Sequence, residues 1–459
     1  MSGRFVSSRL PAATLAPPGR LAGVLRSRRA RLDTRRGPGP FGLLPALVTA
    51  VALVSCAPEG DVPAEAPLSL ADLLTGADTA GYERARVPRP FEFPADHGPH
   101  PGFRTEWWYV TGNLTSAEGR DFGFQLTFFR SALSPEPPEA ESAWATNQAY
   151  LAHFTVTDVG AGRFYAHERF ARGAVGLAGA TAAPLRVWLE DWALEAGPPE
   201  SSGSGPAESP SQGPAETSVE STAERHARTF PLRLTADADS VALRLELGPG
   251  KPPVLQGQRG LSRKGPEPGN ASYYYSLTRM PAAGTLTLPA DTLRVTGSAW
   301  LDREWGTSAL SQGVVGWDWF ALQLDDGWDL MVYRLRRGDG RSTSFSQGVL
   351  VDSSGESERL AWGEDVTVEP RGAWTSPRDG TVYPSGWVVR LPKRAWELTV
   401  SPRVQDQELA LSFRYWEGAV SVRGRGEGGE PVGGRGYVEL TGYGDQARLE
   451  GGAAMGPPR

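Results

Sequence analysis

Residues 317–335 read WDWFALQLDDGWDLMVYRL, and this stretch decides the fold. Two runs rich in aromatic and branched residues, Trp317–Leu324 and Asp329–Leu335, flank the turn sequence Asp325-Asp326-Gly327. Such residues favour strands, and an Asp-Gly pair between them favours the tight turn of an antiparallel hairpin. The stretch therefore predicts two β-strands joined by a short turn.

The same pattern recurs along most of the chain. Short segments of similar composition, bounded by Gly, Pro, Asp or Asn, predict further strands at Glu106–Leu114, Phe122–Phe129, Tyr150–Asp158, Leu185–Leu194, Leu232–Leu234, Val241–Leu247, Leu293–Trp300, Trp387–Leu391, Trp396–Val400, Leu409–Trp416 and Gly436–Thr441. Helical periodicity is scarce, and Leu68–Leu74 predicts one short helix. Many short strands at regular spacing predict an all-β sandwich or barrel.

The chain divides into several parts. The two halves of the chain have similar patterns, because each begins with a Trp-rich strand beside a charged cluster. This similarity predicts two consecutive β-barrel domains at residues 86–285 and 286–447. Residues 197–227 are low in complexity and cannot pack a core, so they are expected to form a disordered insert in the first domain. Residues 56–85 are expected to be a flexible tether and residues 448–459 a disordered tail.

The first 55 residues have the layout of a secretory signal. Nine arginines and a single acid accompany an apolar run from Phe41 to Ser55, which is shorter than the roughly 20 residues that span a bilayer. The run ends in Leu53-Val54-Ser55-Cys56, which resembles the lipobox of bacterial lipoproteins, in which the Cys is acylated and becomes the mature N-terminus. The alternative is an ordinary signal peptide followed by an incidental Cys56.

Removal of this leader changes the charge. The leader carries +8, from nine arginines against one acid, so the formal charge of −6 for the chain becomes −14 for residues 56–459. A strongly acidic chain argues against nucleic acid as a partner. The chain has one cysteine, so no disulfide is expected. Ala57 stands in place of the Asp that retains lipoproteins at the inner membrane, so lipid anchoring at the outer membrane, on its periplasmic side, is expected.

One candidate site lies in a Trp-rich strand. Side chains alternate between the two faces of a strand, so Glu106 and Trp108 are expected on one face, and Trp107 and Tyr109 on the other. All four are candidate ligand-binding residues.

Histidines and phenols supply further candidates. His97, His100 and Glu106 could bind a metal, but their spacing lacks the geometry of a zinc motif, so no metal or other cofactor is predicted. His153 shares a strand face with its apolar neighbours and is either a ligand-binding residue or a satisfied core histidine. The run Ser272–Ser276 either lines a pocket with phenols or packs at the domain junction.

A second cluster, Trp300–Gly306, combines two acids with an arginine. Asp302 and Glu304 fall on one face of a regular strand, roughly 6–7 Å apart. If both are buried, desolvation and mutual repulsion favour the neutral form of one, which can then donate a proton. Asp302 and Glu304 are therefore candidate catalytic acids, and Arg303 is a candidate for tuning them.

A third cluster, Gly316–Phe320, is expected to present Trp317 and Trp319 on one face. Aromatic faces attract cations by roughly 0.5–2 kcal/mol per contact. Together with Trp305, these indoles could stabilise the carbocation that forms when an alkene is protonated, before water adds to it. The alternative is structural, because small barrels often close one end with Trp stacked on Arg and with Arg–carboxylate pairs.

The clusters resemble a known family. Six motifs in order, over residues 90–445, resemble the AttH-like proteins, a group related to the carotenoid 1,2-hydratases: His97 with Glu106–Gly112, Phe128–Arg130, Ala149–Phe154, Tyr273–Ser276, Gly297–Gly306 and Gly316–Phe320. The resemblance implies two lipocalin-like β-barrel domains, the second beginning near residue 290.

The resemblance also bears on function. The hydratases add water to the terminal double bond of an acyclic carotenoid, with a carboxylic acid and aromatic neighbours. Asp302 matches their motif, but Arg303 and Glu304 stand where they carry His and Asn. Tyr333 matches a tyrosine of the hydratases and is a candidate catalytic residue, whereas Leu335 stands where they place an acid. AttH-like members resemble components found alongside ABC-type permeases.

Three functions follow, and they leave open whether the protein is an enzyme. The first is a lipid-anchored binding module whose barrels hold an apolar lipid or isoprenoid and assist an ABC-type permease. The second is a hydratase-like hydro-lyase that protonates a polyene through Asp302 or Glu304. The third is a structural partner of a membrane complex. Anchoring at Cys56 favours the first, because a tethered pocket meets lipid-borne molecules more readily than cytoplasmic ones.

Overall fold

The computed structural model describes residues 68–69, 79–197, 226, 229–307 and 310–444. These residues belong to the compact unit Glu65–Arg459. Signal segment 1–55, Cys56, the tail 448–459, and most of the predicted tether and insert lie outside the described residues. Within the described residues, no helix is both long and apolar enough to cross a membrane.

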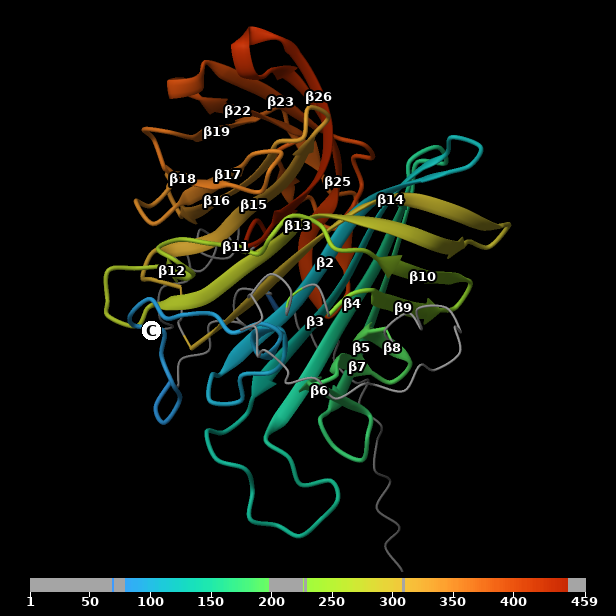
Figure 1. Cartoon of the computed structure of the whole chain (residues 1–459), viewed down its shortest axis with the longest axis vertical. Helices are drawn as coiled ribbons and strands as arrows, with labels where there is room; N and C mark the ends of the chain where they lie inside the picture. The colour runs from blue at the N-terminus through green and yellow to red at the C-terminus, as the bar shows by residue number, and fades with distance from the viewer. Residues whose placement is uncertain (1–67, 70–78, 198–225, 227–228, 308–309, 445–459) are drawn as a thin grey trace, which may run out of the picture. The chain divides into compact units, whose positions relative to one another are not determined.

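The first sheet joins thirteen described strands and is antiparallel throughout (Figure 1). Across the sheet, the strands follow the order β5 (Arg163–Arg172), β4 (Gln148–Asp158), β3 (Asp121–Ala132), β2 (Thr105–Ser116), β14 (Thr292–Gly306), β13 (Ala271–Thr287), β10 (Val241–Leu247), β9 (Leu232–Ala238), β8 (Trp192–Ala196), β7 (Leu185–Leu189) and β6 (Ala178–Ala182). Two short strands, β11 (Val254–Leu255) and β12 (Leu261–Arg263), pair with β13.

The second sheet joins eleven described strands. Its order is β18 (Ser357–Ala361), β17 (Gln347–Val351), β16 (Asp329–Arg337), β15 (Val314–Leu324), β26 (Pro431–Leu440), β25 (Phe413–Arg425), β23 (Trp396–Pro402), β22 (Gly386–Leu391) and β19 (Thr367–Arg371), with β24 (Glu408–Ala410) and β1 (Leu68–Ser69) also on β25. A bridge between Trp362 and Val366 joins the chain just after β18 to the chain just before β19, so the sheet nearly closes on itself.

Small elements complete the described chain. Strands β20 (Trp374–Thr375) and β21 (Val382–Tyr383) form a separate pair. Three short 3-10 helices are η1 (Ala95–His97), η2 (Pro392–Arg394) and η3 (Glu427–Gly429).

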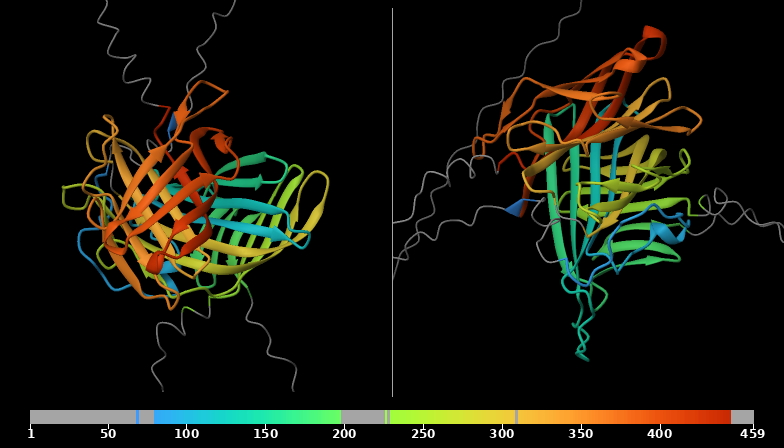
Figure 2. Two further views of the ribbon diagram at one scale, coloured as in Figure 1. Left: turned by 90° about the horizontal axis from the view of Figure 1, so that it is seen from above. Right: turned by 90° about the vertical axis from the view of Figure 1, so that its left-hand side faces the viewer.

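Each sheet encloses its own apolar core, and a third cluster joins the two sheets. This third cluster combines Tyr109, Tyr274 and Trp300 of the first sheet with Trp319 and Tyr333 of the second. Figure 2 shows the orange and red strands of the second sheet packed beside the blue-to-green strands of the first. The aromatic side chains of the candidate site therefore gather where the sheets face each other.

The prediction of an all-β protein is confirmed, and most predicted strands coincide with observed ones. Two predicted strands are wrong in length. Leu185–Leu194 divides into β7 and β8 at a tight turn, in which Glu190 takes a left-handed conformation with φ of 56° without a glycine to signal it. Leu409–Trp416 likewise divides between β24 and β25.

Two further features differ from the pattern in the sequence. Leu68 and Ser69, predicted to begin a helix, pair in parallel with β25, and the rest of that predicted helix lies outside the described residues. The chain passes from the first sheet to the second between Gly306 and Val314, because β14 pairs with β2 and β13 along its length. Residue 285, where the sequence suggests a boundary, lies within β13.

Candidate functional site

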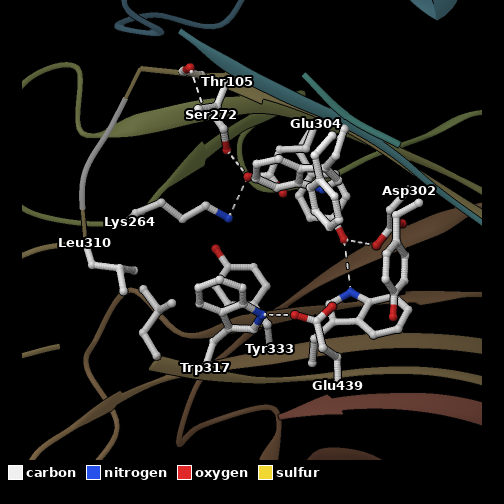
Figure 3. A pocket seen from close by; sticks show the side chains of 16 residues that line it. Thr105, Lys264, Ser272, Asp302, Glu304, Leu310, Trp317, Tyr333 and Glu439 are labelled. Atoms are coloured by element: carbon white, nitrogen blue, oxygen red, sulfur yellow. Dashed lines mark hydrogen bonds and ion pairs between the residues drawn. The ribbon is translucent and has the colours of Figure 1, made fainter. Parts of the chain in front are cut away.

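A cavity of about 110 Å³ lies where the two sheets face each other (Figure 3). The first sheet lines it with Thr105, Trp107 and Tyr109 of β2, Phe129 of β3, Ser272 and Tyr274 of β13, and Asp302, Glu304 and Gly306 of β14. The second sheet contributes Trp317 and Trp319 of β15, Tyr333 and Leu335 of β16, and Glu439 of β26, while connecting segments supply Lys264 and Leu310. The lining thus combines aromatic rings with carboxyl groups and one ammonium.

Strand pairing sets these side chains in rows, because directly paired residues share a face of the sheet. In the first sheet, Tyr274 of β13 pairs with Glu304 of β14. In the second sheet, Trp319 pairs with Tyr333 on one side and with Glu439 on the other. The two rows meet across the cavity.

The predicted alternation of faces is confirmed. On β2, Trp107 and Tyr109 line the cavity, whereas Trp108 packs into the core of the first sheet. On β15, Trp317 and Trp319 both line the cavity.

Asp302 is buried at the cavity and has hydrogen bonds but no ion pair within the described residues. Its Oδ1 accepts hydrogen bonds from Ser276 Oγ at 2.5 Å and Trp300 Nε1 at 2.7 Å, and its Oδ2 accepts one from the Tyr274 hydroxyl. Burial raises the pKa of Asp302 to about 7, although these hydrogen bonds oppose the rise. A carboxyl group of this kind keeps its proton close to neutral pH and can donate it.

Tyr274 connects Asp302 with the tryptophans. Trp319 Nε1 donates a hydrogen bond of 3.2 Å to the Tyr274 hydroxyl oxygen. Burial and the charge of Asp302 raise the pKa of Tyr274 well above its usual value, so the phenol stays protonated. When Asp302 is protonated, the Tyr274 oxygen can accept hydrogen bonds from both neighbours, and its own proton is then free to point into the cavity.

An ion pair lies at the same cavity. Lys264 Nζ is 3.0 Å from Glu304 Oε1 and 4.4 Å from the centroid of the Tyr333 ring, and the Ser272 hydroxyl donates to the same Glu304 oxygen (Figure 3). Burial lowers the pKa of Lys264, but attraction to Glu304 and Tyr333 outweighs it and raises the pKa overall. The pair offers a carboxylate that can accept a proton and an ammonium that can hold an anionic oxygen.

Two more carboxyl groups lie on the second sheet. Glu417 of β25 pairs directly with Glu439 of β26. Trp317 Nε1 donates a hydrogen bond of 2.9 Å to Glu439 Oε1, and the Tyr109 hydroxyl donates one to Glu417 Oε1. Burial raises the pKa of Glu439 to about 8. Burial, with the charge of Glu439, also raises the pKa of Glu417 well above its usual value. Two buried carboxyls this close hold at least one proton at neutral pH.

The opposite face of β14 carries an ion cluster that does not line the cavity. Arg303 is fully buried and forms an ion pair with Glu106, which also pairs with Arg130. The Arg303 guanidinium carbon lies 3.9 Å from the centroid of the Trp108 ring. Burial raises the pKa of Glu106, but Arg303 and Arg130 outweigh it and hold the pKa well below its usual range. Three candidate residues, Glu106, Trp108 and Arg303, therefore lie behind the cavity wall.

Two other candidate residues also lie away from the cavity. Trp305 stacks on the His100 imidazole with ring centroids 3.8 Å apart, within the first sheet. His153 is fully buried, with Nδ1 2.7 Å from the Tyr415 hydroxyl and Nε2 3.2 Å from Glu168 Oε2.

The histidines near the first cluster do not converge on a metal site. His97 Nδ1 is 2.6 Å from the Tyr275 hydroxyl, and His97 Nε2 is 3.2 Å from His226 Nδ1, so both ring nitrogens already have partners. In the part of the chain that the structure describes, no group of three or more His, Cys, Asp or Glu side chains is placed to hold a metal ion.

The cavity unites many of the candidates from the sequence, namely Asp302, Glu304, Tyr333, Trp107, Tyr109, Trp317 and Trp319. Sequence reasoning missed Lys264 and Glu439, and it left the role of Tyr274 open. Lys264 is one of three lysines in the chain, which is a weak signal. Glu439 has no motif around it, and only the pairing of β26 with β15 brings it to the cavity.

Fold and cavity together define an all-β protein whose two lipocalin-like sheets enclose a cavity lined with acids and indoles. The family model for AttH-like proteins matches residues 84–443, so the chain belongs to the AttH-like family. The predicted family and its lipocalin-like fold are thereby confirmed.

Solved structures agree with this assignment. A crystal structure described as that of an AttH protein from Nitrosomonas europaea is 33% identical, with a TM-score of 0.64, and the match covers 79% of this chain and 99% of that one. Kievitone hydratase from Nectria haematococca is 15% identical, with a TM-score of 0.55, over 79% of this chain and 96% of that one. At that identity the second likeness shows the fold alone. No curated protein matches the sequence.

Proposed function

We propose that the protein is an acid–base enzyme of the hydro-lyase type, which protonates a carbon–carbon double bond and adds water to it. The observation that carries the proposal is Asp302, a buried carboxyl at a cavity, with neutral hydrogen-bond donors and no ion pair within the described residues. An acid whose pKa lies near the working pH is suited to proton transfer.

The proposed reaction delivers one proton to the substrate and removes one proton from the water that is added. The π electrons of the double bond take the hydroxyl proton of Tyr274, and Asp302 passes its own proton to the Tyr274 oxygen. The resulting carbocation faces the indoles of Trp317 and Trp319, which attract positive charge. Water adds to the cation, and Glu304 accepts the proton that the added water releases. Proton return from Glu304 to Asp302 completes the cycle.

Cavity size limits the substrate. A dry cavity of roughly 150 Å³ accepts benzene, and this one measures about 110 Å³. The reacting group is therefore a short unsaturated segment, either a small alkene or the end of a longer isoprenoid whose remainder lies outside. Kievitone hydratase has a name that describes water addition, so this chemistry is compatible with the fold, although fold alone does not define function.

Water labelled with ¹⁸O tests the proposal. The full chain is incubated with small isoprenoid alkenes and enones in labelled water, and products are examined by mass spectrometry. We expect labelled alcohols, and we expect Asp302→Asn to lower kcat by roughly 10²–10⁴-fold, as loss of a general acid does. Asp239→Asn, at an 87% exposed side chain, is the matched control and should keep wild-type activity. Label incorporation that is equally fast in Asp302→Asn would refute the role of Asp302.

The second candidate function is binding of an apolar lipid or isoprenoid without reaction, in support of an ABC-type permease. It is favoured by the rings and aliphatic groups of Trp107, Phe129, Leu310 and Leu335 in the cavity lining. Anchoring through Cys56 belongs to this proposal, and radiolabelled palmitate should label wild-type protein in cells but not Cys56→Ala. Native mass spectrometry that finds a co-purifying lipid, with no turnover of any alkene, would favour binding over hydration.

A further inference from the structure

We propose that Glu439 exchanges protons with solvent through a chain of side chains that leads away from the cavity: Glu417, Tyr415, His153 and Glu168. The proposal rests on the proposed acid–base function, because only a reaction that moves protons needs such a route. Glu439 lines the cavity but is only 7% exposed, so direct access of solvent to its carboxyl is restricted. A second path would then decide how fast Glu439 exchanges its proton.

Strand register supplies the geometry of this path. Asp302 pairs with Tyr109, Tyr109 with Thr127, Thr127 with His153, and His153 with Glu168, so one row of side chains crosses β14, β2, β3, β4 and β5. Residues of one row share a face, which here is the face toward the second sheet. The row therefore runs from the cavity to Glu168, whose side chain is 18% exposed.

Inner contacts connect the two glutamates with Tyr415. The Tyr109 hydroxyl donates to Glu417 and lies beside the Glu439 carboxyl. The Tyr415 hydroxyl lies beside the Glu417 carboxyl, whose Oε2 has no hydrogen-bond partner among the described residues. Tyr109, Glu417 and Tyr415 are all nearly inaccessible to solvent, so these side chains rather than bulk water must carry the proton.

Outer contacts continue the chain to the surface. His153 Nδ1 is 2.7 Å from the Tyr415 hydroxyl, and His153 Nε2 is 3.2 Å from Glu168 Oε2. Ser412 Oγ donates to the other Glu168 oxygen at 2.6 Å. An imidazole with one partner on each nitrogen can take a proton on one side while it releases a proton on the other.

Glu417 and Glu439 are surrounded by acidic and neutral groups, so protonation is the way in which their charge is neutralised. Carboxyls and phenols face Glu417, namely Glu439, Tyr109, Tyr415 and Tyr437, and within the described residues neither glutamate forms an ion pair with a lysine or arginine. Gln125 Nε2 donates to the Tyr415 hydroxyl at 3.3 Å and adds no charge. The cluster therefore holds at least one proton near neutral pH.

Each transfer in the chain conserves charge and electrons. Glu168 takes a proton from solvent and gives it to His153 Nε2, and His153 releases the Nδ1 proton to the Tyr415 oxygen. Tyr415 passes its hydroxyl proton to Glu417, and Glu417 passes one to Glu439 through the Tyr109 hydroxyl. One proton enters for each proton delivered, and return of the imidazole to its first tautomer resets the chain.

A pH jump on the full chain tests the route without any substrate. The pH is lowered from about 9 to about 6, and protonation of Glu439 is followed by time-resolved infrared spectroscopy of the carboxylic acid C=O stretch. Glu439→Gln identifies its band. Tyr415→Phe removes one hydroxyl from the chain, and we expect it to slow protonation of Glu439 roughly tenfold or more, with the final amplitude unchanged. Glu168→Gln, at the partly exposed outer end, should slow it similarly.

Tyr437→Phe is the matched control, because its buried hydroxyl lies 3.4 Å from Thr155 Oγ1 and outside the proposed chain. It should keep the wild-type rate. Equal slowing in Tyr437→Phe would attribute the effect to loosened packing and overturn the proposal. An unchanged rate in Glu168→Gln would also overturn it, even if Tyr415→Phe did not fold, and would assign proton entry to the cavity. Because no turnover is measured, this result is independent of whether an alkene is hydrated.

Discussion

Glu106 and Asp302 lie on neighbouring strands of the first sheet and point to its opposite faces. Both are almost fully buried, with exposed fractions of 0% and 3%. Arg303 and Arg130 hold the pKa of Glu106 well below its usual range, whereas Asp302 has neutral hydrogen-bond donors and its pKa is raised to about 7. Burial alone therefore does not decide the charge of a carboxyl. The partners on each face do, so one face is a stable ion cluster and the other a source of protons.

Substitution of Glu106 should destabilise the ion cluster that it forms with Arg303 and Arg130. In Glu106→Gln, the buried Arg303 and Arg130 lose the carboxylate that pairs with both. Removal of one partner from a buried ion pair lowers stability by roughly 3–5 kcal/mol, and we expect a loss of this size in urea unfolding at neutral pH. This is the largest loss of stability expected among these substitutions.

Glu358→Gln is the control for that change, because Glu358 pairs with Arg394 at 2.6 Å but its side chain is 56% exposed. Exposed ion pairs contribute little, so this variant should unfold like wild type. If Glu106→Gln were as stable as this control, the contrast between the two faces would be wrong.

Substitution of Asp302 should change the pH dependence of stability. The pKa of Asp302 is about 7 in the folded protein and 3.8 in a model peptide, so between these values the folded state holds a proton that the unfolded state has lost. The free energy of unfolding therefore falls as pH rises through this window, by at most about 1.4 kcal/mol per pH unit. Asp302→Asn removes this contribution, and denaturation at a series of pH values should give a flatter curve than wild type.

The amide can keep much of the hydrogen bonding at this position. Its oxygen can accept from Ser276 and Trp300 as the carboxyl does, and its NH₂ group can donate to the Tyr274 oxygen. The variant should therefore fold normally. A curve parallel to that of wild type from about pH 5 to pH 7 would mean that Asp302 is ionised throughout this range.

Substitution of Tyr274 should have the smallest effect on stability. The Tyr274 hydroxyl lowers the pKa of Asp302, so Tyr274→Phe should raise that pKa further, at a loss of about 1 kcal/mol of stability for one hydrogen bond. A ¹³C NMR titration of the Asp302 carboxyl measures the shift. Tyr273→Phe is the control, because its hydroxyl donates to the Val87 carbonyl instead. If both variants changed the pKa of Asp302 equally, the Tyr274 hydroxyl would have no specific effect on that carboxyl.

Local patterns carried the prediction of the strands and of their faces. Aromatic and branched runs predicted β2, β15 and β16, and alternation predicted that Trp107 and Tyr109 share a face. These properties depend on neighbours along the chain, which the sequence displays directly.

Properties that depend on distant pairing could not be predicted in this way. Glu439 reaches the cavity because β26 pairs with β15, and Lys264 because it follows β12 on the edge of β13. Arg303 was predicted beside the acids of its own segment, but its partner is Glu106 on β2. A charged motif in the sequence identifies the charged residues, whereas the register between strands decides which of them form ion pairs.

The pairing of β26 with β15 also has a consequence for the order in which the protein is made. Trp317 and Glu439 are separated by 122 residues, although one donates a hydrogen bond to the other. Chains are synthesised and begin to fold from the N-terminus, and contacts between distant residues form slowly. A nascent chain that already holds Asp302 therefore presents the unpaired edge of β15 until β26 emerges, and such edges attract other strands. A chain that stops before residue 431 would contain the acid and most of the cavity lining but would leave one edge of β15 unpaired, and it would be a target for chaperones and proteases rather than a less active protein.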